Sequence, residues 1–214
     1  MTFIRPTCLA VMLMVTTSIT TLLQAQDEKV VLESYRKAAM KTGQPAAGKT
    51  VFESKQAACA KCHALAGQKP LAGPNLSVIG DKYARDQLIQ SVLQPSAQLH
   101  PDYASQVVIT RDGKSFTGIL HQQTKEEIQL LDADSKLVRI ARQDIDEQMR
   151  SKTSLMPANL YKAITQQQFV DLVEYLTTLR QKDGQAYPGM PTNIPAVAKP
   201  ASVVPLHDET MRFD

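Results

Sequence analysis

The sequence predicts a mainly α-helical fold that carries a small antiparallel β insertion of about four strands. Two observations lead to this prediction. Apolar residues recur at helical spacing before residue 94 and after residue 164. Between Tyr103 and Ala141 the chain instead shows short β-type runs, which turn formers such as Asp112-Gly113 separate.

Three helices are expected in the first half of the chain, at residues 28–40, 46–57 and 85–93. The sequence gives no clear role to the first. The second contains Gly48, which would let another backbone approach closely, and it leads into a pair of cysteines. Pro95 ends the third helix.

Four runs are expected to form the strands, at residues 105–110, 115–120, 127–131 and 136–140. Four antiparallel strands with regular turns can curl into a small barrel or meander and bury one face. Residues 103–148 are therefore expected to be a compact insertion.

A last helix is expected over residues 165–180. Thr165 and Gln168 have the form of a capping box, and Asp183-Gly184 closes the helix. Its apolar stripe is expected to be core, packed on the helix around Gly48 and Phe52. The stripe consists of Phe169, Leu172, Val173, Leu176 and Leu179.

Residues 1–25 have the form of a secretory signal peptide. Arg5 precedes a largely apolar run from Leu9 to Leu23, and the segment ends in Leu23-Gln24-Ala25, a small-residue cleavage pattern. Threonines dilute the run, so it is too short to span a membrane. No transmembrane anchor is therefore expected after cleavage.

The charge of the chain argues against nucleic acid as a partner, and the composition of its last residues predicts a tail. Removal of residues 1–25 would take away one base and no acid, which leaves a net charge of +2. This gives no basic excess that would indicate nucleic-acid binding. Five prolines after Tyr187 predict a flexible tail over residues 185–214.

Cys59-Ala-Lys-Cys62-His63 is the motif that carries chemistry. Each thiol can add across one vinyl group of a haem while the histidine reaches the iron from the same turn. The spacing therefore predicts one covalently bound haem c, attached through Cys59 and Cys62 and ligated by His63. This attachment is completed outside the bacterial cytoplasm, which agrees with the signal peptide and predicts a periplasmic location.

Two different uses of the cysteine pair compete with haem attachment. A zinc ribbon needs a second ligand pair at matching spacing, and a thioredoxin-like dithiol should lie beside a βαβ pattern. The sequence shows neither, and Cys8 lies in the segment expected to be removed. Haem attachment is therefore favoured over metal binding and over dithiol redox chemistry.

The loop after His63 is rich in glycine and proline over residues 67–76 and cannot form regular structure. A ligating histidine usually donates its second ring N–H to a fixed acceptor. The carbonyl of Pro74 is the predicted acceptor in this chain, with a plain surface loop as the competing interpretation.

Met156 is the predicted second axial ligand of the iron. It lies in Ser154-Leu155-Met156-Pro157, just before the last helix, where the proline stiffens the backbone. A methionine sulfur there would block small-molecule binding and raise the reduction potential, which suits electron transfer. Met149 is the fallback, followed by His100 or an open sixth position; His121 and His207 are weaker candidates.

Through these residues the chain resembles the class I cytochromes c. The motifs follow that family's order: Gly48 to Phe52, the Cys59 to His63 motif, the loop Gly73-Pro74-Asn75-Leu76, Met156-Pro157, and the helix around Asp171 to Leu176. More narrowly, it is similar to the haem-binding domain common in planctomycete and verrucomicrobial proteins. There a segment like Tyr103 to Glu147 separates the third helix from a Ser-Leu-Met-Pro motif.

The resemblance implies a helical fold around one haem, with His63 and Met156 as axial ligands and Cys59 and Cys62 as thioether anchors. The resemblance and the sequence patterns described above together divide the chain into six parts. These are a signal peptide (1–25), a leading helix (26–45), the first part of the cytochrome domain (46–102), the β insertion (103–148), the second part of that domain (149–184) and the tail (185–214).

The two expected iron ligands, His63 and Met156, are 93 residues apart. Each doubling of the length of a loop adds only ~0.6 kcal/mol to the entropic cost of closing it, so the insertion is tolerable if it folds by itself with its ends close together. It could shield the haem or present a docking face, and the sequence does not choose between these.

The expected function is that of a monohaem electron carrier, or of an electron-accepting subunit of a dehydrogenase or respiratory chain. Its redox partners would be separate proteins. The competing functions are a haem-based sensor and a peroxidase-like enzyme, both with an open or exchangeable sixth ligand. The periplasmic dihaem peroxidases would need a second Cys-x-x-Cys-His motif, which the sequence lacks.

Overall fold

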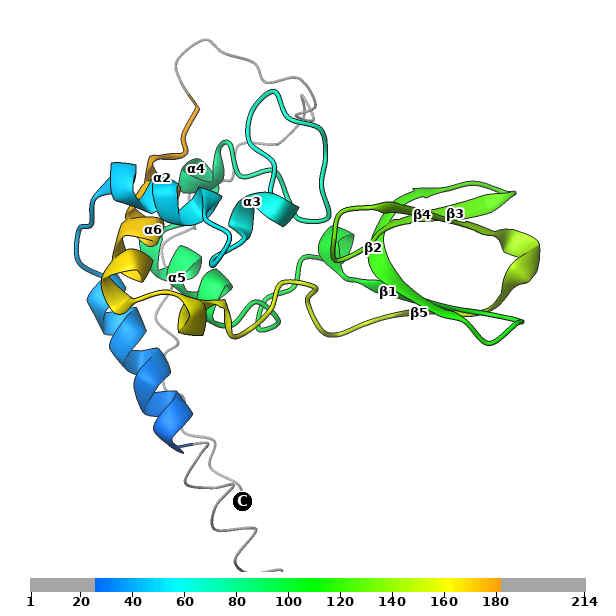
Figure 1. The fold of residues 1–214 in the computed structure, drawn as a ribbon, viewed down its shortest axis with the longest axis horizontal. Coiled ribbons are helices and arrows are strands. Elements are labelled where there is room, and N and C mark those ends of the chain that lie inside the picture. The colour runs from blue at the N-terminus through cyan, green and yellow to red at the C-terminus, as the bar shows by residue number, and fades with distance from the viewer. Residues whose placement is uncertain (1–25, 182–214) are drawn as a thin grey trace, which may run out of the picture.

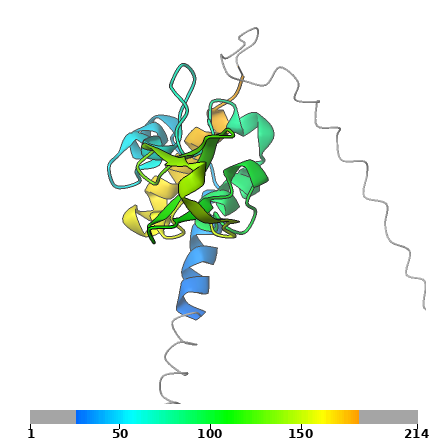
Figure 2. The ribbon, with the colours of Figure 1, turned by 90° about the vertical axis from the view of Figure 1, so that its right-hand side faces the viewer.

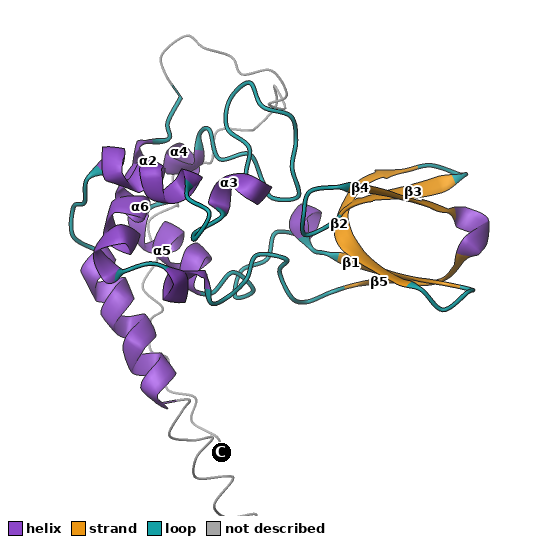
Figure 3. Cartoon of the chain, viewed as in Figure 1, coloured by secondary structure: helices purple, strands orange, loops and turns teal. Residues whose placement is uncertain are grey.

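The structure, a computed structural model, describes residues 26–181. Helices gather in one part of it, and the strands form a second part beside them (Figure 1). Colouring by secondary structure separates these two parts clearly (Figure 3). The predicted signal peptide (1–25) and tail (185–214) lie outside the described residues.

Six α-helical segments occur within residues 26–181. They are residues 26–39, α2 (Pro45–Glu53), α3 (Cys59–Cys62), α4 (Ile79–Lys82), α5 (Arg85–Leu93) and α6 (Gln166–Thr178). Short 3₁₀ helices lie at η1 (Pro101–Tyr103), η2 (Arg142–Asp144) and η3 (Leu160–Ala163). The helices predicted at 28–40 and 85–93 are confirmed, whereas the one predicted at 46–57 ends earlier, because Ser54 is extended. The helix predicted at 165–180 is present but ends at Thr178, and the Asp183-Gly184 pair expected to close it lies outside the described residues.

Helices α2 and α6 form the centre of the helical core. A Cβ atom on Gly48 would lie 1.9 Å from the carbonyl oxygen of Asp171 and 2.7 Å from Cβ of Tyr175, so only glycine allows this contact. The Phe52 and Tyr175 rings lie beside it, with centroids 5.7 Å apart. The predicted packing of the last helix on Gly48 and Phe52 is confirmed, as is the capping box of Thr165 and Gln168.

The N-terminal helix, residues 26–39, is part of this core. The Tyr35 ring packs edge-on against Tyr161 and Phe169, and its hydroxyl donates to the carbonyl of Ile164 at 3.1 Å. The helix therefore covers the start of α6, which answers what the sequence left open about its role.

Five antiparallel strands form one sheet in the order β4-β3-β2-β1-β5. They are β1 (Gln106–Thr110), β2 (Ser115–Gln123), β3 (Glu127–Leu131), β4 (Leu137–Ala141) and β5 (Ile145–Arg150). The prediction of four strands is wrong, because β5 pairs with β1. After Ile145 this strand is exposed and Met149 is its one apolar residue, so it has no apolar alternation to reveal it. With five strands, the fold is mixed α and β and not mainly α.

The sheet is folded over on itself. The first half of β2 pairs with β1 and the second half with β3, with a register shift between Leu120 and Gln122. Figure 3 accordingly shows β3 and β4 facing β1 and β5 across an interior. A small core fills that interior, made by Val108, Ile128, Leu130 and Ile140. The compact barrel-like meander expected from the sequence is therefore present, and it lies in front of the helices in Figure 2.

The two ends of the β part meet. The amide of Ser151 donates to the carbonyl of Ser105 at 2.8 Å, and the Ser105 hydroxyl donates to the carbonyl of Thr153 at 3.0 Å. Gln106 of β1 is paired with Arg150 of β5. The strands can therefore stand between the two expected ligand segments without forcing them apart.

Among residues 26–181, no helix is long and apolar enough to cross a membrane.

Replacing Gly48 by alanine is expected to destabilise the fold. A glycine-to-alanine change normally stabilises a helix by about 0.5–1 kcal/mol. Here the added methyl group meets the α6 backbone, so we expect the free energy of unfolding to fall by about 1–3 kcal/mol in urea titrations. The control is Lys49→Ala on the exposed side of the same helix, for which a change within about 0.5 kcal/mol is expected. A stabilised Gly48→Ala protein would contradict the close packing.

Candidate haem-binding site

The two cysteines lie at either end of α3. Ala58 precedes this helix with φ 52°, a left-handed conformation that turns the chain out of the segment after α2. Cys59 and Cys62 are three residues apart on one helical turn and share a face. Both are free and partly buried.

His63 follows α3 directly, and its ring is held by the loop predicted to contact it. Nδ1 lies 2.9 Å from the carbonyl oxygen of Pro74, which is the hydrogen bond that the sequence predicted. Because a carbonyl only accepts, Nδ1 carries the proton, and the lone pair of the neutral ring is on Nε2. Within residues 26–181 no hydrogen bond engages Nε2.

A short stretch of backbone pairing holds the ring and this loop together. The amide of Gly73 donates to the carbonyl of Cys62 at 2.7 Å, and the amide of Leu76 donates to the carbonyl of Ala64 at 2.9 Å. A Cβ atom on Gly73 would lie 2.7 Å from Nδ1 and Cε1 of His63. The loop can therefore lie this close to the imidazole only because residue 73 is glycine.

Burial sets the protonation of the three motif side chains. It lowers the pKa of His63 below its usual range, opposed by the Pro74 carbonyl, and so favours the neutral imidazole that binds iron. Burial raises the pKa of Cys59 to about 11. It also raises the pKa of Cys62, against the opposing effects of the Lys61 charge and the Ser135 hydroxyl. Both sulfurs are therefore thiols near neutral pH.

Met156 is partly buried and packs against the helical core, as Cys59 does. Its segment is anchored by a chain of hydrogen bonds. The Met156 amide donates to the Ser154 hydroxyl at 3.1 Å, and the Ser154 amide donates to the Ser96 hydroxyl at 3.1 Å, just beyond α5. Met156 and Cys59 thus lie against one apolar cluster.

The remaining candidate ligands lie elsewhere. Met149 is in β5 with 41% of its surface exposed, and His121 is exposed in β2. His100 is exposed beside η1, where its Nδ1 accepts from the amide of Asp102 at 3.3 Å. Cys8 and His207 are outside the described residues.

The turn between β3 and β4 is a neighbour of the motif that sequence reasoning missed. Asp134 pairs with Lys61 at 2.6 Å, and Sγ of Cys62 lies 3.7 Å from the carbonyl oxygen of Ala133. An apolar cluster continues this contact and joins Ala72 of the loop, Leu155 beside Met156, and the β part through Tyr103, Ile119 and Leu131. No local pattern reveals such contacts, because the partners are about seventy residues apart.

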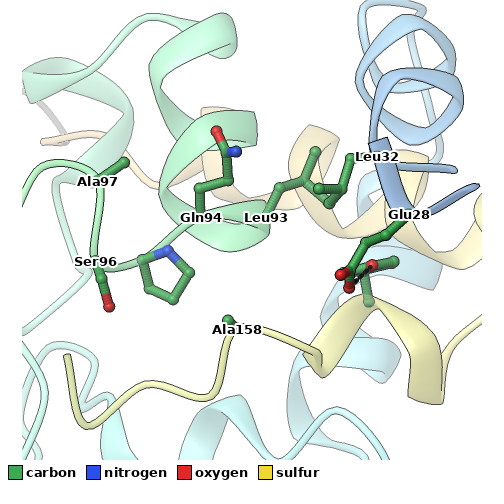
Figure 4. Close-up of a pocket in the computed structure, with 9 residues that line it drawn as sticks. Glu28, Leu32, Leu93, Gln94, Ser96, Ala97 and Ala158 are labelled. Atoms are coloured by element: carbon green, nitrogen blue, oxygen red, sulfur yellow. Dashed lines mark hydrogen bonds between the residues drawn. The ribbon is translucent and has the colours of Figure 1, made fainter. Parts of the chain in front are cut away.

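A pocket of about 300 Å³ lies between the N-terminal helix, the end of α5 and the segment leading to η3 (Figure 4). It contains none of the predicted haem-binding residues. Its wall is formed by Glu28, Leu32, Leu93, Gln94, Pro95, Ser96, Ala97, Ala158 and Tyr161.

The donor set fits a haem bound through the motif. Two thiols one turn apart can form two thioethers, and the fixed His63 ring keeps Nε2 available for iron. The iron of a bound haem supplies one-electron chemistry, while the chain supplies attachment, ring orientation and burial. Among residues 26–181, no group of three or more His, Cys, Asp or Glu side chains could hold a metal ion by itself.

Gly73→Ala is expected to displace the His63 ring, because the new methyl group would overlap it. We expect loss of the downfield NMR signal of the hydrogen-bonded Nδ1 proton in the haem-loaded protein. The matched control is Gly67→Ala in the same loop, where φ is +78° and no atom lies within 4 Å of the new carbon. That control strains the backbone but leaves the ring in place, so an equal loss in both variants would contradict the steric account.

Comparison with known proteins agrees with this chemistry. Residues 45–131 match the family model described as Cytochrome c. The matched region runs from α2 to β3 and so includes the cysteine pair, His63 and Pro74, but it ends before Met156. No curated protein matches the chain. The match supports a c-type cytochrome domain in this part of the chain, a family that implies covalently bound haem c.

Proposed function

We propose that this protein is a monohaem c-type cytochrome that carries electrons in the periplasm, either as a free carrier or as the electron-accepting subunit of a dehydrogenase or respiratory chain. The cytochrome c match supports electron transfer through haem c. The periplasmic location and the subunit role rest on the predicted signal peptide and on the resemblance to class I cytochromes c.

One observation carries the proposal: the His63 ring is fixed through Nδ1 by Pro74 while Nε2 stays available, directly after a helical turn with two free thiols. This is the arrangement that a covalently held, histidine-ligated haem requires. A hydrogen bond to a backbone carbonyl also makes the imidazole more electron-rich, which strengthens its bond to iron.

Met156 completes the proposed site as the second axial ligand. It is partly buried on the same apolar cluster as Cys59, whereas Met149 is exposed in the sheet. If Met156 held the iron, its sulfur would close the iron to small molecules and would favour the reduced state, as an electron carrier needs. The narrower likeness to the planctomycete and verrucomicrobial haem-binding domain is part of this proposal and supports the same ligand.

Replacing Met156 by alanine tests this assignment. The wild-type haem protein is expected to show a six-coordinate, low-spin spectrum and no CO binding to the reduced form at neutral pH. Met156→Ala should become high-spin or take up CO readily, because the sixth position is then open. Met149→Ala is the matched control and should keep the wild-type spectrum, since its side chain projects from an exposed strand.

Two results would overturn the proposal. Ready CO binding by the native reduced protein would favour a sensor or an enzyme with an open iron site. An unchanged low-spin spectrum in Met156→Ala would show that another residue is the ligand.

A further inference from the structure

Two hairpin turns in the β part have the same backbone geometry. In the β1–β2 turn, the amide of Gly113 donates to the carbonyl of Thr110, and the Thr110 amide donates to the carbonyl of Lys114. In the β3–β4 turn, Ser135, Asp132 and Lys136 make the corresponding bonds. Both turns therefore place one residue in the left-handed region, Gly113 with φ 81° and Ser135 with φ 57°.

The two turns differ in which residue occupies that position. Glycine is the favoured residue there, and any other residue adds strain of order 1–3 kcal/mol. Gly113 follows this rule, and a Cβ atom on it would have no neighbour within 4 Å. Ser135 departs from it although its turn is otherwise well formed, with the Asp132 carboxylate accepting from the amides of Asp134 and Lys136 at 2.8 Å each. The departure from glycine directs attention to what the serine side chain contacts.

Its hydroxyl group joins the two segments of the proposed haem site. It donates to the carbonyl of Lys61, inside the cysteine motif, at 3.0 Å and accepts from the amide of Ala72 at 3.2 Å. The residues that follow these two, Cys62 and Gly73, are paired directly through their backbones at 2.7 Å. The serine hydroxyl thus links Lys61 to Ala72 next to the direct backbone hydrogen bond between Gly73 and Cys62, as a bridging water would.

The neighbours of Ser135 strengthen the same contact. Asp134 pairs with Lys61 at 2.6 Å, and the carbonyl oxygen of Ala133 lies 3.7 Å from Sγ of Cys62. Ile119 and Leu131 of the sheet pack with Ala72. The turn therefore lies over the sulfur of the second predicted thioether and over the start of the loop that orients His63.

We propose that Ser135 is a positioning residue of the haem site, and that the β insertion holds the haem-binding peptide, Cys59 to His63, in place and shields the haem edge at Cys62. The inference rests on the proposed function. Ser135 acts on the His63 ring through Ala72 and the Pro74 carbonyl, two residues further along the same loop, and would not itself contact the iron. Of the two roles that the sequence left open for the insertion, this geometry favours shielding.

The test compares Ser135→Gly with Gly113→Ser in the full haem-loaded protein. Ser135→Gly relieves the turn of strain and removes the bridging hydroxyl together with the β-carbon. We expect the amide of Ala72 to exchange with solvent roughly tenfold faster, as loss of one hydrogen bond implies. We also expect a lower midpoint potential, because water reaching the haem edge stabilises the oxidised iron. Gly113→Ser strains the free turn and should change neither quantity.

Ser135→Ala keeps the β-carbon and removes only the hydroxyl, so it separates loss of the hydroxyl from the greater backbone freedom of glycine. It should also lower the midpoint potential. Faster Ala72 exchange with an unchanged potential would overturn the proposal, because the contact would then be only structural. Unchanged exchange would also overturn it. Failure of the wild-type chain to bind haem covalently would refute the proposed function, whereas Ala72 exchange can still be measured in that chain.

Discussion

The pairing of the loop around Gly73 with the end of α3 is the contact on which the rest of the site depends. It brings the Pro74 carbonyl to Nδ1 of His63 and leaves Nε2 available. The approach is possible only because residue 73 has no side chain to overlap the imidazole. Once the ring is fixed, α3 presents two thiols on the adjoining turn, and these three side chains together fit the covalent attachment of a haem.

The helical part supplies a rigid base for this arrangement. Gly48 lets α2 lie directly on α6, and α2 then delivers the chain toward α3. Arg85 of α5 pairs with Glu174 of α6 and also donates to the carbonyls of Ala39 and Lys41, so it ties the end of the N-terminal helix to both. Although burial acts to raise it, the pKa of Glu174 is lowered by hydrogen bonds from Arg85 and the Gly43 amide. The carboxylate therefore stays charged and holds three helices together.

The β part is placed where it can contact both segments that bear predicted ligands. Its ends meet at Ser105 and Ser151, so the chain leaves and rejoins the helical part at nearly the same point. Ile119 and Leu131 of its sheet pack in one apolar cluster with Ala72 and Leu155. A folded unit with closely spaced ends costs little entropy as an insertion, and here it also adds contacts that neither loop could make alone.

The sequence by itself predicted the haem-binding motif and determined most of the helices, because both depend on local patterns. The spacing of Cys59, Cys62 and His63 and the glycine at position 48 can be read directly from the chain, as can the Pro74 acceptor. The fifth strand could not be, since its edge position demands no apolar alternation. Only the tertiary structure decided that the β3–β4 turn lies on the motif, because that contact joins backbone and side-chain atoms of residues 74 positions apart. Folding of the sheet brings those atoms together, and no local sequence pattern records it.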